Sequence, residues 1–83
     1  MHSIGRYHIF WHSTRVKWSE CPDSFEDKAK AKAYATKFLK THYLNDVTIA
    51  VRTPDGKDWI PLLIRRRILK DHKPYYGEWE ECE

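Results

Sequence analysis

Few residues carry reactive or metal-binding side chains, and their spacing predicts no catalytic or metal site. The chain has five histidines and two cysteines, Cys21 and Cys82. His8 and His12 would pair on a helix, but in the extended run 6–12 their spacing separates them by about 13 Å. Neither a CxxC pair nor a glycine-rich phosphate loop occurs in the sequence. We therefore expect a protein without catalytic residues, metal or cofactor, and not an enzyme.

Basic and aromatic residues could give this chain a function through binding to another molecule. Rings among Arg and Lys suit single-stranded nucleic acid, whose bases stack on rings and whose phosphates contact cations. Arginine equally suits the carboxylates of an acidic protein surface. The candidate binding residues are Phe10, Lys17, Arg52, Trp59, Arg65 and Arg67 on strands, and Lys30, Lys37 and Lys40 on a helix. The alternative for both groups is a solvated surface, where Arg and Lys are common.

The helix predicted over residues 24–41 organises the rest of the chain. Its apolar side recurs at helical spacing and consists of Phe25, Ala31, Tyr34, Ala35, Phe38 and Leu39. Lysines occupy most of the remaining surface. Asp23 or Ser24 is expected to cap the first turn, with Glu26 completing a capping box. Asn45 is expected to adopt the left-handed conformation that ends the helix.

Four segments show the alternation of apolar and polar residues that is typical of strands: 6–12, 14–20, 47–52 and 57–67. The first two are expected to form a hairpin that ends at Cys21 and Pro22, because proline cannot donate to a strand ladder. The sequence TPDG at 53–56 predicts the turn between the last two. Pro61 indicates that its strand is at an edge or contains a bulge.

Together these elements predict an α+β fold, a two-layer sandwich with one helix on an antiparallel sheet, in the order strand-strand-helix-strand-strand. The helix should cover Tyr7, Ile9, Trp11, Val16, Trp18, Val47, Ile49, Val51, Ile60, Leu62 and Ile64. The opposite face should then display His8, Phe10, His12, Arg15, Lys17, Arg52, Trp59, Leu63, Arg65 and Arg67. A basic and aromatic sheet face is therefore the first candidate for binding.

The chain is expected to be a single domain over residues 1–83, with a core at 6–67 and an acidic aromatic tail at 70–83. Residues 70–74 are predicted to be a loop. The following segment, PYYGEWEEC, either adds a fifth strand or lies over the open sheet face as a lid, with Trp79 on the sheet and glutamates paired with arginines.

Composition excludes some classes of protein. Hydrophobic residues make up 41% and charged residues 33% of the chain, with a formal net charge of +3, as is usual for soluble globular proteins. No apolar run approaches the roughly 18 residues that cross a bilayer, and MHSIGRYHIF lacks a signal-peptide pattern. We expect a cytoplasmic protein with no membrane partner and with both cysteines as free thiols.

Within residues 6–67, the turn TPDG, the helix KAKAKAYATKF and the strand VTIAVR resemble, in architecture, small phage-encoded proteins that include some type I anti-CRISPR proteins. GRYHIFWHSTRVKW followed by a helix is also similar to the arm-type DNA-binding modules of phage integrases. Those modules usually have three strands before the helix, and two are predicted here. Both resemblances imply a mobile-element context and binding without chemistry, and neither carries over a functional residue.

The first hypothesis is a small inhibitor that occupies the surface of a bacterial nucleoprotein complex such as a type I CRISPR effector. Arg52, Arg65, Arg67 and Lys17 would contact the partner, and Phe10 and Trp59 would be apolar anchors. A nucleic-acid-binding module that uses the same sheet face or the helix lysines is the first alternative. A structural or interaction domain with no nucleic-acid role is the second.

Overall fold

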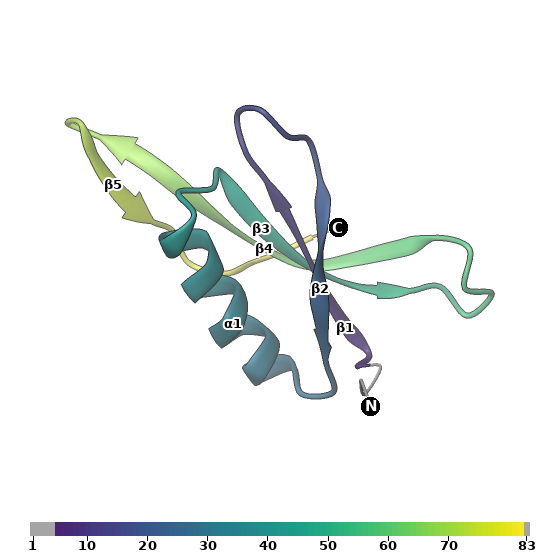
Figure 1. The fold of residues 1–83 in the computed structure, drawn as a ribbon. Coiled ribbons are helices and arrows are strands. Elements are labelled where there is room, and N and C mark those ends of the chain that lie inside the picture. The colour runs from purple at the N-terminus through teal and green to yellow at the C-terminus, as the bar shows by residue number, and fades with distance from the viewer. Residues whose placement is uncertain (1–4, 83) are drawn as a thin grey trace.

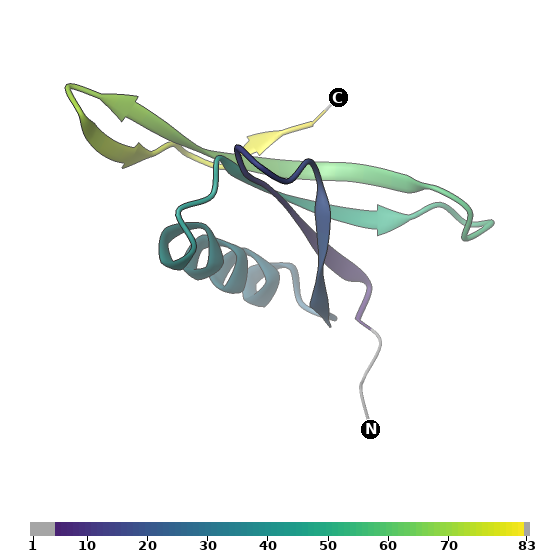
Figure 2. The same cartoon turned by 45° about the horizontal axis from the view of Figure 1, so that its top comes forward.

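One helix packs against one face of an antiparallel sheet in the computed structural model, which describes residues 5–82 (Figure 1). The elements are β1 (Tyr7–His12), β2 (Ser19–Phe25), α1 (Lys28–Thr41), β3 (Asp46–Arg52), β4 (Trp59–Lys70), β5 (Lys73–Tyr76) and β6 (Glu80–Glu81). The strand order is β2-β1-β3-β4-β5, and β6 also pairs with β4. Figure 2 shows α1 on one side of the sheet and no second layer of the described chain on the other. The predicted α+β class is confirmed.

The core lies between α1 and the central strands. Ala31, Ala35 and Leu39 are buried at a four-residue spacing on α1, and the two alanines let the helix lie close to the sheet. They meet Ile9 of β1 and Ile49 of β3, which are fully buried. Half-buried rings surround this centre: Tyr7, Trp11, Phe25, Tyr34, Phe38, Tyr76 and Trp79. The predicted apolar side of the helix and the predicted helix-facing residues of β1 and β3 are confirmed.

The helix begins four residues later than predicted, at Lys28, and its N-cap is Asp27. An oxygen of the Asp27 side chain accepts a hydrogen bond from the backbone N–H of Ala29 at 2.8 Å. Asp23 and Ser24 remain in β2 because that strand stays paired with β1 as far as Phe25. The Ser24 hydroxyl accepts a hydrogen bond from the Gly5 N–H at 2.8 Å instead of capping α1.

Replacing Asp27 by alanine is expected to destabilise the protein by about 1 kcal/mol, because one N–H of the first helical turn loses its acceptor. The free energy of unfolding in urea measures this. Glu26→Ala is the matched control, since Glu26 is equally exposed and acidic but is not the N-cap. Equal losses for the two variants would show that the general charge near the helix start matters and the cap does not.

The end of α1 also differs from the prediction. Tyr43, and not Asn45, has the left-handed conformation, with φ of 53°. The N–H of Leu44 donates to the Leu39 carbonyl at 3.2 Å, which is the pattern of a Schellman motif. Asn45 instead joins two strands, because its N–H donates to His12 and its carbonyl accepts from Arg67, both at 2.8 Å.

The second strand is displaced from the predicted 14–20 to Ser19–Phe25, and residues 13–18 form a loop. Val16 and Trp18 are therefore exposed and do not join the core, which corrects their predicted place. Cys21 and Pro22 lie inside β2, where the register against β1 shifts. This bulge accommodates a proline that has no N–H for the ladder, and it turns Cys21 into the core.

A bulge in β4 reverses the predicted alternation of its side chains. Ile49 lies opposite Leu63, but Ala50 lies opposite Pro61, so Leu62 is the extra residue. Pro61 is therefore at a bulge, one of the two predicted possibilities. Beyond it, Leu63 shares the helix-facing side with Ile49. Because side chains alternate along β4, Arg65 and Arg67 also lie on the helix side, and Ile64 lies on the open face. The sequence predicted the opposite face for each of these residues, and that prediction was wrong.

The predicted loop at 70–74 is a tight hairpin. Asp71 and His72 form its two-residue turn with φ of 53° and 62°, as a type I′ turn requires. The ladder between β3 and β4 ends at Asp46 and Arg66, so residues 67–76 form a two-stranded ribbon. The β4–β5 ribbon projects from the sheet in Figure 1. The tail is thus part of the sheet, and Trp79 packs on the core and is not a lid.

Candidate functional site

The open face of the sheet brings together several predicted residues from different strands. On β1 and β3, one face of the sheet carries the side chains of His8, Phe10, His12, Thr48, Ala50 and Arg52. Pairing with Arg52 and Ala50 adds Trp59 and Pro61 from β4. Phe10, Arg52 and Trp59 therefore share a face as predicted. Arg65 and Arg67 do not lie on this face, and Lys17 is in the 13–18 loop.

An apolar groove of about 280 Å³ lies on this face, lined by Phe10, Trp18, Thr48, Ala50, Trp59 and Pro61. The rings of Trp18 and Trp59 contact His12 and His8, respectively, which are at opposite ends of β1. The groove therefore lies between two indoles above the middle of the sheet. Its volume suits one or two apolar side chains of a partner.

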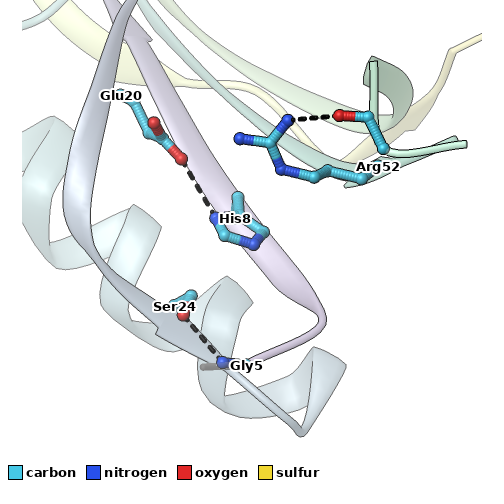
Figure 3. Close-up of polar contacts among 6 residues, drawn as sticks. Gly5, His8, Glu20, Ser24 and Arg52 are labelled. Atoms are coloured by element: carbon cyan, nitrogen blue, oxygen red, sulfur yellow. Dashed lines mark hydrogen bonds and ion pairs between the residues drawn. The ribbon is translucent and has the colours of Figure 1, made fainter. Parts of the chain in front are cut away.

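Several side chains hold Trp59 in place. Its ring meets the rings of His8 and Phe10 edge-on, each with centroids 4.8 Å apart. The Arg52 guanidinium carbon lies 4.3 Å from the Trp59 ring centroid, and its Nη1 donates to the Gly56 carbonyl at 3.0 Å (Figure 3). Because these contacts fix the ring before binding, little rotamer entropy would be lost when a partner contacts it.

Trp18 lines the side of the groove opposite Trp59, and its surroundings differ from those of Trp59. It stacks on His12 with centroids 5.7 Å apart, yet 52% of its surface is exposed. Its φ of 23° is unfavourable for a residue with a side chain. An exposed tryptophan in a strained conformation contributes little to the stability of the fold.

Thr48 lines the groove without adding an accessible polar group to it. Only 5% of Thr48 is exposed, and its Oγ1 is buried without a hydrogen-bond partner within residues 5–82. A buried hydroxyl without a partner costs about 1–3 kcal/mol.

Carboxylates lie beside several of the basic or imidazole side chains on this face. His8 Nδ1 lies 3.0 Å from Glu20 Oε1, a contact that Figure 3 marks with a dashed line. His12 Nδ1 lies 3.2 Å from Asp46 Oδ2, and Arg66 Nη1 lies 3.1 Å from Glu80 Oε2. The open face therefore has an apolar groove with carboxylates around it, and is not the basic face expected from the sequence.

Neither cysteine is placed for nucleophilic chemistry. Burial, with smaller contributions from Asp23 and Glu20, raises the pKa of the Cys21 thiol to about 11. Burial also raises the pKa of Cys82. Both thiols are therefore protonated at neutral pH, and a protonated thiol is a poor nucleophile. Within residues 5–82 no three His, Cys, Asp or Glu side chains gather as a metal site.

The remaining predicted residues, Lys30, Lys37 and Lys40, are exposed on α1, which lies on the other side of the sheet from the groove. Sequence reasoning missed Trp18 and Thr48 as groove residues. The alternation of residues 14–20 assigned Trp18 to the core, and Thr48 carried no signal beyond its place in a strand. In the described part of the chain, no helix is long and apolar enough to cross a membrane.

Comparisons with protein-family models, with curated proteins and with solved structures find no match.

Proposed function

We propose that this chain is a small, non-enzymatic binding protein that attaches to a partner protein through the open face of its sheet. The groove between Trp18 and Trp59 is the observation that carries the proposal. Tryptophan and arginine dominate binding energy at protein interfaces, especially where they line pockets. The carboxylates of Glu20, Asp46 and Glu80 around the groove favour a protein partner with a projecting apolar side chain over bare phosphates.

The area that such an interface needs is larger than the groove. A stable complex buries about 800 Å² on each partner. The residues beside the groove therefore take part as well, among them His8, Arg52 and Ile64 on the same face. This arrangement places two tryptophans at the centre and polar and charged groups at the rim, which is the usual anatomy of a specific interface.

The resemblance to small phage-encoded inhibitors puts bacterial defence complexes first among the partners. In this proposal the chain acts in the cytoplasm of a bacterial host and occupies a surface of a nucleoprotein complex, such as a type I CRISPR effector. Inhibition then follows from covering a site that DNA must reach, without any chemical step.

Size-exclusion chromatography of the chain with purified type I effector complexes tests this proposal. We expect the chain to elute with at least one complex and to lower its affinity for target DNA. Absence of a stable complex with every effector would contradict the choice of partner. A complex that forms but leaves DNA binding unchanged would contradict inhibition by occupancy.

A further inference from the structure

The β4–β5 ribbon extends past the end of α1, and its outer part, residues 68–75, is exposed on both faces (Figures 1 and 2). Ile68 lies opposite Tyr75 on one face, and Leu69 lies opposite Pro74 on the other. The exposed fractions of Ile68, Tyr75 and Leu69 are 52%, 51% and 67%. A two-stranded hairpin with no cover is marginally stable in water. We therefore looked for a partner that would cover both faces of this outer ribbon.

Cations lie at the tip of the ribbon and on both faces at its base. Residues 66–76 contain four Arg or Lys residues and one Asp. At the base, Arg66 lies on the open face and Arg67 on the helix side. At the tip, Lys70 lies directly opposite Lys73, and like charges in opposite positions repel. Within residues 5–82 neither lysine is in an ion pair, so both are free to contact an anion.

This distribution excludes several kinds of partner. A flat protein surface would contact one face of the ribbon and leave apolar side chains of the other in water. A bilayer would require an apolar tip, but the turn residues Asp71 and His72 lie between Lys70 and Lys73. Pairing of an added strand with the free edge of β5 is disfavoured, because Pro74 has no N–H to donate. The partner must therefore be a cleft with negatively charged walls.

We propose that the outer ribbon enters the major groove of double-stranded DNA tip first. The major groove is about 12 Å wide and about 8.5 Å deep. A β-ribbon with side chains on both faces is about 10 Å thick, and at about 3.3 Å per residue Lys70 lies about 10 Å beyond Arg67. The tip therefore reaches the floor of the major groove when the base of the ribbon reaches its rim. The minor groove, about 6 Å wide, is too narrow for the ribbon.

Each cation of the ribbon has an anionic or acceptor group within reach in this arrangement. Arg66 and Arg67 point to opposite walls of the major groove, and each contacts a backbone phosphate. The ion pair of Arg66 with Glu80 is exposed, so its exchange for a phosphate costs little. Lys70 and Lys73 reach base edges, where guanine offers two acceptors to a lysine. The site goes beyond the proposed function, and it lies outside the apolar groove between the two tryptophans.

Fluorescence anisotropy with a labelled 20-base-pair DNA duplex tests this inference. We expect a Kd on the order of 10 μM or tighter at 50 mM salt. Binding should weaken as salt rises with a log–log slope of at least about 1.8, because each of the two arginines contributes about 0.9. An RNA duplex of the same sequence should bind at least about tenfold more weakly, because its major groove is deep and narrow.

Two single substitutions test whether both faces of the ribbon contact DNA. Ile68→Thr and Leu69→Thr change opposite faces, and each should lower the affinity at least about threefold. The melting temperature should change little, since both side chains are largely exposed and threonine suits a strand. Val16→Thr is the matched control, an exposed apolar residue outside the ribbon, and should bind as tightly as the unchanged chain. Trp18→Ala should also keep full affinity, which distinguishes this site from the apolar groove.

Replacing Lys70 and Lys73 together by threonine should lower the affinity for the DNA duplex at least about tenfold. The melting temperature should not fall, because the substitution removes a repulsion. Replacing Lys17 and Lys57 together by threonine is the matched control, since it removes the same charge from two exposed loop positions. This control variant should lose less than about twofold in affinity.

Four results would overturn the inference. They are no binding of the DNA duplex at 50 mM salt, and equal binding of the RNA duplex or of poly-glutamate. A loss for only one of Ile68→Thr and Leu69→Thr would mean that one face alone is in contact. An equal loss for the two double lysine variants would mean diffuse attraction to the whole chain.

Discussion

Replacing Trp18 by alanine is expected to weaken binding of the partner protein about thirtyfold or more and to leave the fold intact. Alanine removes one side of the groove, and truncation of a central interface tryptophan costs about 2 kcal/mol or more, where about 1.4 kcal/mol is a tenfold change in affinity. Stability should change little because the ring is 52% exposed and its contact is a stack on His12.

Calorimetric titration of the partner measures the affinity, and urea unfolding measures the stability of each variant. Val16→Ala is the matched control, since Val16 is an exposed apolar residue of the same loop but does not line the groove. Unchanged affinity of Trp18→Ala would contradict the groove as the binding site even if co-elution were observed. A large loss for Val16→Ala would extend the interface to the whole loop.

Leu63→Ala is expected to destabilise the protein by about 3 kcal/mol, as removal of a buried leucine usually does. Leu63 is 6% exposed and belongs to the core cluster with Ile49 and Leu39. Ile64→Ala should cost about 1 kcal/mol, because Ile64 is on the open face and only half-buried, so its methyl groups lose less burial. Urea unfolding of the two variants compares neighbouring residues of one strand.

The same pair of variants tests the bulge on which the chemistry of both sheet faces depends. If Ile64→Ala cost more than Leu63→Ala, β4 would continue without an extra residue at Leu62. Arg65 and Arg67 would then return to the open face, which would become basic. The helix side would lose these two arginines, and the groove would lie on a basic face.

The bulge separates the chemistry of the two sides of the sheet. The open face has an apolar groove bordered by carboxylates, histidines and arginines. The helix side has Lys40 and Arg67 beside tyrosine rings.

Features that depend on local sequence pattern could be predicted without the structure. Period-two alternation identified β1 and β3 with their inward faces, and the TPDG segment identified the turn, where the Gly56 N–H donates to the Thr53 carbonyl at 2.8 Å. Helical spacing identified Ala31, Ala35 and Leu39 as the buried side of α1. These features follow from backbone geometry within a few residues, so one helix on an antiparallel sheet could be predicted.

The positions of the shifts in strand pairing depend on contacts that form in the folded chain. The bulges at residues 21–23 and at Leu62 interrupt the strand ladders next to prolines, and partners distant in sequence set their positions. A shift of one residue exchanges the two faces of a strand. It moved Arg65 and Arg67 to the helix side, and the displaced β2 left Trp18 exposed beside the groove. Local alternation contains no information about such a shift, because the pattern on each side of a bulge is still regular.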